Sequence, residues 1–414
     1  MTRNKLFCSK PFDYFEPGVD GDAFLCCPSW LPRSVGNVAR TDPAAVWNSK
    51  RAQEIRASIL DGDFRYCSER CPHLQAVDGP VRPVAEVTDA RHLEILAKRT
   101  TVMTRGPRTL VCSYDRSCNL ACPTCRPNVL QASRRERVRL GAMQDGLREA
   151  FEKDLEVLYV TGSGDPFGSP LFFELLTSLD AQASAGMRVH LHTNAQLFSE
   201  ERWQALANMH SLLDSIEVSI DAASAATYHI NRAPGRWDRL QQSLKLLGRL
   251  RREGAFRRLS LSFVVQANNW REMPAFVELA RAVGADGVYF GELVQWWFPR
   301  KVMGLPIGKV PVLDHKEYAR RAVHMPEHPE HREFVAQLQA LARGDDRSFL
   351  SLGGLLHLTK SAPAEDPGGS PAGRPAGEPA GRPAGEPARR PAGQAAAAPP
   401  SVRREPLREQ FEQE

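Results

Sequence analysis

The sequence has no long apolar run, and this absence excludes the simplest membrane architectures. No stretch of its 414 residues supplies the roughly 20 consecutive apolar residues that a helix needs to cross a bilayer. Residues 1–8 are polar and contain no apolar segment of the kind found in secretory signals. Net charge is small too, at +5, with lysine and arginine spread along the chain. We therefore expect a cytoplasmic protein with no membrane partner and no nucleic-acid partner.

Cysteine is scarce, with nine residues in the whole chain, but it is strongly grouped. Grouped cysteines in a chain with no apparent leader favour metal sites in a reducing compartment over disulfide bonds. One group contains Cys8, Cys26, Cys27, Cys67 and Cys71, and the other contains Cys118, Cys122 and Cys125. Cys112 lies outside both groups, and we expect it to be a small buried apolar residue.

The second group carries the most specific signal in the sequence. Three residues separate Cys118 from Cys122, and two separate Cys122 from Cys125. Three thiolates on one short loop can hold three irons of a 4Fe-4S cluster, which leaves the fourth iron open to another ligand. The alternative is a structural zinc site, but zinc needs a fourth protein ligand and none lies nearby. We predict that these three cysteines are cluster ligands.

The region around the cysteine loop alternates between strand and helix patterns, which predicts an α/β fold. Because parallel strands need crossover connections, this order favours a partial (β/α)6 TIM-like barrel. Strands are expected at residues 109–114, 156–161, 188–193, 215–220, 259–266 and 287–292. Helices are expected at residues 89–98, 134–154, 169–185, 199–209 and 270–283, with a further helical stretch ending at residue 252. In barrels of this kind, functional residues follow the carboxyl ends of the strands.

The cysteine loop resembles the signature of the radical S-adenosylmethionine (radical SAM) enzymes. In that family the amino and carboxylate groups of S-adenosylmethionine (SAM) bind the open iron, and reductive cleavage gives a 5′-deoxyadenosyl radical that abstracts hydrogen from the substrate. The residue before the last cysteine is commonly aromatic in the family and is Thr124 here. This departure removes no ligand.

Later segments are similar to the family's cofactor-binding elements, in the same order. Gly162-Ser163-Gly164-Asp165 resembles the Gly-Gly-Glu element, which implies contact with the cofactor's ammonium group. Thr193-Asn194 resembles part of the Thr-Asn-Gly element.

Two further elements complete the resemblance. Ser219 and Asp221 are expected near the ribose, and Arg232 near the methionine carboxylate, unless Arg232 merely solvates a loop. Val265 and Gln266 lie in the stretch that borders the adenine.

The first cysteine group resembles a SPASM or twitch auxiliary-cluster domain. The resemblance includes the pairs Gly21-Asp22, Gly36-Asn37 and Trp47-Asn48. It implies one auxiliary iron-sulfur cluster, expected to be 4Fe-4S, and the ligands would be Cys8, Cys26, Cys67 and Cys71. Cys27 is then spare or an alternative ligand, and zinc in the same four-cysteine site remains open. The family commonly carries this domain after the barrel, whereas here it comes first.

These assignments divide the chain into five parts. We expect an auxiliary-cluster domain at 1–74, a connector at 75–106, the radical SAM core at 107–294 and a C-terminal extension at 295–360. Residues 361–414 are rich in proline, alanine and glycine with alternating charges, so we expect a disordered tail.

The function implied by the resemblance is hydrogen abstraction from a peptide or protein substrate. A radical SAM dehydrogenase of a small polyol or aminosugar is one alternative, and a non-catalytic iron-sulfur or zinc protein is another. Reductive cleavage also requires a low-potential electron donor such as flavodoxin or ferredoxin. The sequence identifies neither the reaction after hydrogen abstraction nor a general acid or base.

Overall fold

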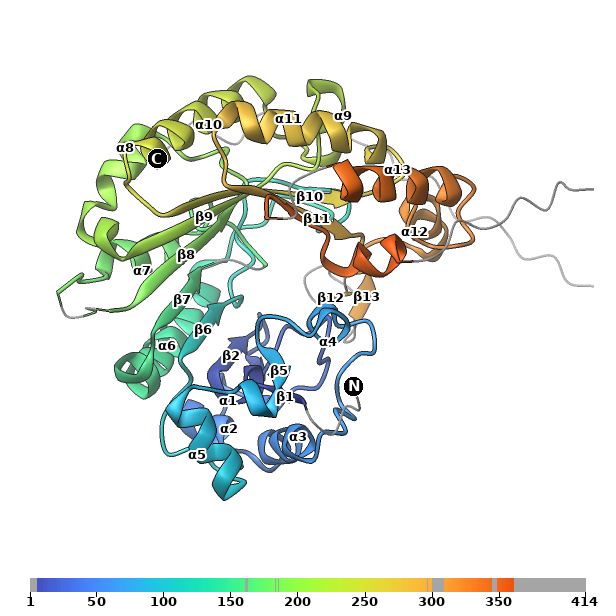
Figure 1. Ribbon diagram of the computed structural model, residues 1–414. Coiled ribbons are helices and arrows are strands. Elements are labelled where there is room, and N and C mark those ends of the chain that lie inside the picture. Colours follow the sequence, from blue (N-terminus) through green and yellow to red (C-terminus); the bar gives the residue numbers. More distant parts are fainter. Residues whose placement is uncertain are drawn as a thin grey trace, which may run out of the picture. The chain divides into compact units, whose positions relative to one another are not determined.

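A run of six parallel strands forms the centre of the fold in the computed structural model (Figure 1). Neighbours pair in sequence order, as a (β/α) series requires. The strands are β6 (Thr109–Cys112), β7 (Val157–Val160), β8 (Arg188–Thr193), β9 (Leu213–Ser219), β10 (Arg258–Val265) and β11 (Gly287–Glu292). The structure describes residues 6–160, 163–182, 184, 186–295, 297–299, 309–344 and 348–360. The predictions for Gly162 and for the tail at 361–414 fall outside these ranges.

Helices fill the connections between the parallel strands and pack their apolar sides on the sheet. They are α6 (Arg134–Phe151), α7 (Pro170–Ser178), α8 (Glu200–Ala205), α9 (Ala225–Asn231), α10 (Trp237–Arg252) and α11 (Met273–Val283). Serine side chains cap four of them, which satisfies amide groups that the first helical turn leaves free. The α/β class and the parallel sheet are therefore confirmed. Among the described strands the sheet stays open, running from β14 (Leu350–Ser351) to β4 (Gly36–Asn37).

The N-terminal segment extends this same sheet. Strand β2 (Tyr14–Pro17) pairs in parallel with β6, with Tyr14 opposite Thr109, and β3 (Asp22–Phe24) and β4 continue the sheet in antiparallel fashion. A separate pair joins β1 (Leu6–Cys8) to β5 (Val81–Pro83). The helices of this segment are α1 (Lys10–Asp13), α2 (Pro43–Trp47), α3 (Lys50–Asp61), α4 (Pro72–Ala76) and α5 (Ala90–Lys98).

Aromatic packing joins the N-terminal segment to the central sheet. The ring of Phe15 lies 5.8 Å from that of Trp47 and 5.3 Å from that of Phe151, both in edge-to-face geometry. These rings and the apolar residues of the parallel strands belong to one continuous buried core. Cys112 is part of that core, with 1% of its surface exposed. Residues 6–74 therefore share a core with the parallel strands of the central sheet.

The C-terminal extension adds small elements beside β11. Its strands are β12 (Trp297–Pro299), β13 (Lys309–Pro311) and β14, and its helices are α12 (His315–Arg321) and α13 (His331–Gly344). β12 pairs with β13, whereas β14 pairs in parallel with β11. No helix in the described ranges is long and apolar enough to span a membrane.

Three predicted helices are shorter in the structure. The helix expected at 134–154 ends at Phe151 and is followed by a 3₁₀ turn, Glu152–Asp154. The helix expected at 169–185 ends at Ser178, because Asp180 accepts a hydrogen bond from the amide of Gln182 at 2.8 Å and turns the chain. The helix expected at 199–209 ends at Ala205 and is followed by a 3₁₀ helix, Ala207–Leu212.

Candidate functional site

The three cysteines of the loop after β6 gather in one small cluster around Leu120. Cys118 and Cys122 are buried, and Cys125 is partly exposed. N–H groups point at all three sulfur atoms. Cys118 Sγ lies 3.5 Å from the amide of Leu120 and 3.6 Å from Asn194 Nδ2. Such donors suit thiolates, and they fit the cluster that the sequence predicts.

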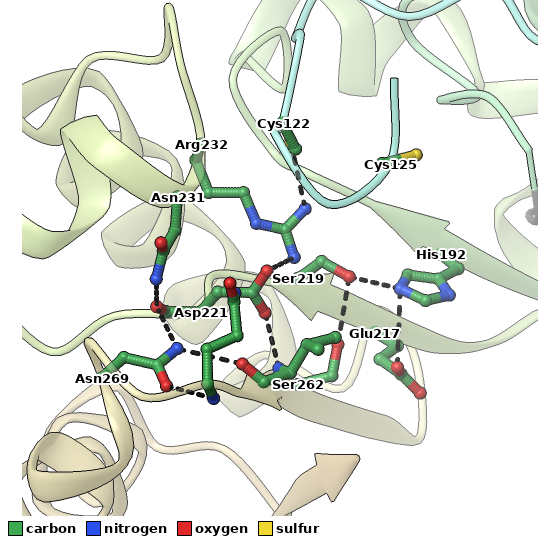
Figure 2. Close-up of polar contacts among 12 residues, drawn as sticks. Cys122, Cys125, His192, Glu217, Ser219, Asp221, Asn231, Arg232, Ser262 and Asn269 are labelled. Atoms are coloured by element: carbon green, nitrogen blue, oxygen red, sulfur yellow. Dashed lines mark hydrogen bonds and ion pairs between the residues drawn. The ribbon is translucent and has the colours of Figure 1, made fainter. Parts of the chain in front are cut away.

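Two arginines supply the donors to the other two sulfurs. Arg126 Nη2 lies 3.3 Å from Cys125 Sγ. Arg232 Nη1 lies 3.9 Å from Cys122 Sγ (Figure 2). Arg126 also donates to the carbonyl oxygen of Ser163, so it joins the cysteine loop to the loop after β7. Burial raises the pKa of Cys122 to about 12, although the charge of Arg232 opposes that shift. A bound metal would replace this proton.

The loop after β7 packs on the cysteine loop without space for a side chain at Gly164. A Cβ atom there would lie 2.5 Å from the carbonyl oxygen of Asp115 and 2.7 Å from that of Ser117. The amide of Asp165 donates to the Ser117 carbonyl at 2.9 Å. Glycine at position 164 therefore lets the two backbones meet.

The Asp165 carboxylate ties this loop to the end of β8. One oxygen accepts from the amides of Phe167 at 2.9 Å and Gly168 at 3.1 Å. The other accepts from the Thr193 hydroxyl at 2.9 Å and the Asn194 amide at 2.7 Å. Burial raises the pKa of Asp165, and these hydrogen bonds oppose the increase.

Asp221 and Arg232 form a buried ion pair beside Cys122. Asp221 Oδ2 lies 2.8 Å from Arg232 Nη2, and the exposed fractions of the two side chains are 4% and 12%. Burial lowers the pKa of Arg232, but the Asp221 carboxylate and Cys122 together outweigh this effect, and the pKa is raised overall. Arg232 Nε is buried and has no hydrogen-bond partner among the described residues. Arg232 is thus part of an internal site and does not solvate a loop.

The end of β10 and the residues after it reach the same ion pair through Asp221. The amide of Val264 donates to Asp221 Oδ1 at 2.7 Å, and Asn269 Nδ2 donates to the Asp221 carbonyl at 3.0 Å. Val265 ends β10, and the amide of Gln266 donates to Asn269 Oδ1 at 2.7 Å. The Nε2 atom of Gln266 is buried and unpartnered within the described part of the chain.

Ser219 lies in a second polar group, which sequence reasoning missed. Its hydroxyl contacts His192 Nε2 and lies 3.1 Å from the hydroxyl of Ser262 (Figure 2). His192 Nε2 is also 3.5 Å from Glu217 Oε1, since the two residues are partners across β8 and β9. The His192 side chain is 40% exposed and that of Glu217 is 35% exposed. Strand alternation could have placed these residues on one face, but only the register brings them into contact.

Four cysteines of the N-terminal group lie near one another, namely Cys8, Cys26, Cys67 and Cys71. The fifth, Cys27, also lies near the carboxylate of Glu16. Cys8 lies close enough to Cys67 and Cys71, and Cys26 to Cys8 and Cys71, for charge on one thiol to raise the pKa of another. Burial is the main reason that the pKa of Cys8 is raised to about 12. Burial, and after it the charge of Glu16, raises the pKa of Cys27, and Cys27 in turn raises the pKa of Cys26.

Neither cysteine group forms disulfide bonds. Among the residues that the structure covers, no three Cys, His, Asp or Glu side chains converge tightly enough to chelate one metal ion. The thiols within each group are neighbours, with a sulfur donor set that suits iron-sulfur clusters.

Comparisons with known proteins agree with both resemblances. The radical SAM superfamily profile matches residues 114–280, and the SPASM profile, described as an iron-sulfur cluster-binding domain, matches residues 8–72. No curated protein sequence matches the chain. The profile matches imply SAM and 4Fe-4S clusters, so zinc in the N-terminal group and a non-catalytic scaffold are both set aside.

Several solved structures are similar at low identity. Streptococcus suis SuiB bound to the precursor peptide SuiA is 13% identical, with a TM-score of 0.37, over 77% of this chain and 67% of SuiB. Native anSMEcpe with bound AdoMet is 15% identical, with a TM-score of 0.38, over 59% of this chain and 63% of the other. The methyltransferase TsrM from Kitasatospora setae is 14% identical, with a TM-score of 0.32, over 44% and 36%. From the two profile matches, the chain carries a radical SAM domain and, ahead of it, a SPASM iron-sulfur domain.

Proposed function

We propose that this chain cleaves SAM at the Cys118 loop and abstracts hydrogen from a peptide or protein substrate. Cys118, Cys122 and Cys125 would hold the SAM-binding 4Fe-4S cluster. The cofactor contacts would come from Gly162, Ser163, Gly164, Thr193, Asn194, Ser219, Asp221, Arg232, Val265 and Gln266. When bound, the cluster and SAM supply a 5′-deoxyadenosyl radical.

The observation that carries this proposal is the buried guanidinium of Arg232 beside Cys122. It lies 3.9 Å from a ligand sulfur, its charge is fixed by Asp221 at 2.8 Å, and its Nε has no partner within the described ranges. A buried donor left without a partner is costly unless a ligand completes it. A carboxylate suits a guanidinium, which supports our assignment of Arg232 to the methionine carboxylate of SAM.

Asp165 has a different role in this proposal from the one expected by resemblance. Both of its oxygens already accept two hydrogen bonds from the protein. A further bond from the cofactor's ammonium group would have to displace one of them. We therefore assign Asp165 to positioning Thr193 and Asn194, with direct contacts left to the backbone near Ser163.

The substrate class follows from the SPASM domain, because auxiliary clusters of this type are most often associated with peptide and protein modification. In this proposal the auxiliary 4Fe-4S cluster is held by Cys8, Cys26, Cys67 and Cys71. Cys27, next to Cys26 in the sequence, would be spare or an alternative ligand.

One observation favours a second candidate, the dehydrogenation of a small polyol or aminosugar. His192, Glu217, Ser219 and Ser262 present hydroxyl, imidazole and carboxylate groups together on neighbouring strands. Such a polar set can bind hydroxyl groups, and the His192–Glu217 pair can hold a proton. The sequence also contains no recognisable domain dedicated to binding a peptide, which favours a small-molecule substrate.

SAM cleavage by anaerobically reconstituted protein tests the proposal. With dithionite we expect 5′-deoxyadenosine and methionine, and about two 4Fe-4S clusters per chain by iron and sulfide analysis. Cys118→Ala should abolish cleavage, whereas Cys112→Ala, in the apolar core, should retain it. Undiminished cleavage by the triple variant of Cys118, Cys122 and Cys125 would refute the assignment. Candidate peptides and polyols are then compared by substrate-dependent 5′-deoxyadenosine formation.

A further inference from the structure

A basic surface with two exposed valines lies directly outside the Cys118 loop. We call it the basic cap and define it by Val129, Arg134, Arg135, Val138 and Arg139. All five residues are exposed, with Val129 at 46% and Val138 at 70% of their surfaces. Val129 precedes α6, and the other four residues form its first turns.

Backbone hydrogen bonds attach this segment to the cysteine loop itself. The amide of Cys118 donates to the carbonyl oxygen of Leu130 at 2.9 Å. The amide of Ala132 donates to the Ser117 hydroxyl, also at 2.9 Å. Val129 is therefore the immediate neighbour of a residue bonded to a predicted cluster ligand. A partner touching the basic cap would approach the cluster through very few intervening atoms.

The charges of the basic cap oppose the stability of the helix that carries them. The positive end of a helix dipole lies at its N-terminus and disfavours cations there. Yet four of the first six residues of α6 are arginines, and the single acid, Glu136, caps the helix with Ser133. Arg134, Arg135 and Arg139 form no ion pair or side-chain hydrogen bond with any other described residue. These charges do not serve the fold.

The two exposed valines of the basic cap do not contribute to the packing of α6 against the core. The buried side of α6 is formed by Leu140, Met143, Leu147 and Phe151. Val138 lies outside this side, and Val129 is exposed on the loop before the helix. Apolar residues surrounded by unpaired charges of one sign are typical of a surface that binds a protein of the opposite charge.

We propose that the basic cap is the docking surface for a small acidic electron-carrier protein, a flavodoxin or ferredoxin, that reduces the cluster at the Cys118 loop. The inference rests on the proposed function, because only reductive SAM cleavage requires electrons at this cluster. The carrier loses one electron and the cluster gains it. The arginines would steer the acidic carrier into place, and the valines would supply the dry contact at the centre.

The test compares two charge-reversal variants of the full chain with its clusters reconstituted. Arg134→Glu/Arg135→Glu removes the positive charge from the basic cap, and it places acids where the helix dipole favours them, so folding is retained. The matched control is Arg239→Glu/Lys245→Glu, which reverses two exposed cations on α10, the first of them in the opening turn of that helix. Both variants change the net charge equally. Flavodoxin is the probe, and its affinity is measured by calorimetry at several salt concentrations.

We expect flavodoxin to bind the Arg134→Glu/Arg135→Glu variant at least tenfold more weakly than the wild type, with a weaker salt dependence, and to bind the control within twofold. SAM cleavage driven by reduced flavodoxin should fall in the first variant only, and cleavage driven by dithionite should be unchanged in both. Unchanged flavodoxin affinity in the first variant would overturn the proposal. So would a loss of substrate-peptide binding with flavodoxin binding intact, which would assign the surface to the substrate. A wild-type protein that cleaves no SAM with dithionite would contradict the proposed function instead, and the affinity comparison would still judge the surface.

Discussion

Replacing Gly164 with alanine should displace the two loops that frame the predicted cofactor site. The added methyl group would lie 2.5 Å from one carbonyl oxygen of the cysteine loop and 2.7 Å from another. Ordinary contact begins near 3.4 Å, so the backbones must separate by roughly 0.7 to 0.9 Å. Both obstacles are backbone atoms, which cannot rotate away as a flexible side chain could.

The energetic cost of this change should be about 1–3 kcal/mol, as for other insertions into tightly packed sites. The displacement also separates Asp165 from the Ser117 carbonyl, now bonded at 2.9 Å, and moves the loop that carries the cluster ligands. A shift of this size in a reacting centre can lower the rate about 100-fold. We therefore expect a modest loss of thermal stability together with a large loss of 5′-deoxyadenosine formation.

The assay measures SAM cleavage with dithionite, bound iron and the unfolding midpoint in the same preparation. Gly141→Ala is the matched control, because its Cβ would meet only Leu171, at 3.9 Å, within helix α6. That change should stabilise the protein by about 0.5–1 kcal/mol and leave activity unchanged. Wild-type cleavage rates in Gly164→Ala would refute the conclusion that backbone contact between these loops shapes the site.

Three further predictions concern other parts of the chain. Replacing Cys67 and Cys71 with alanine should leave 5′-deoxyadenosine formation measurable but stop product formation; a folded variant that still makes the full product would exclude a redox role for the auxiliary cluster. Asp221→Ala should cost about 3–5 kcal/mol in urea unfolding, because it leaves a buried charge unpaired, whereas Asp221→Ala/Arg232→Met should cost less; equal losses would contradict this pairing. Burial lowers the pKa of His324 from 6.5 to about 4. The unfolded chain therefore binds a proton at this histidine more readily than the folded chain does, and the free energy of unfolding decreases as pH falls from 6.5 toward 4. The loss between pH 6.5 and about pH 5 should be near 2 kcal/mol, and His324→Leu should reduce it; urea midpoints at the two pH values check this.

Several elements were predictable because a local pattern determines them. The bounds of β8 and β11 agree with the prediction to the residue, since β8 alternates polar and apolar residues and β11 is a short, mostly buried run. The function of the three-cysteine loop could be predicted in the same way, because the spacing of its cysteines is typical of ligands to a 4Fe-4S cluster. By contrast, β2 and β3 are too short to show a periodic pattern, and their place beside β6 depends on contacts distant in sequence.

The contacts that sequence reasoning missed depend on the register between strands and on two loops that meet in the folded chain. His192 and Glu217 are partners only because β8 and β9 pair as they do. Arg126 follows the last cysteine, but its bonds to Cys125 and Ser163 exist only once two loops meet. For Asp165, the sequence indicated the position correctly as a polar residue after β7, but could not show that both carboxylate oxygens are already occupied.

The pairing of β2 with β6 has a consequence for engineering and for domain exchange. Main-chain bonds tie Tyr14 and Phe15, between Cys8 and Cys26, to the very strand that leads into the Cys118 loop. Excising residues 1–74 would therefore uncover the edge of β6 and remove Phe15 and Trp47 from around Phe151. The auxiliary-cluster segment therefore cannot be moved to another protein as an independent domain. Any chimera must carry β2 with it, or supply a replacement strand of matching register.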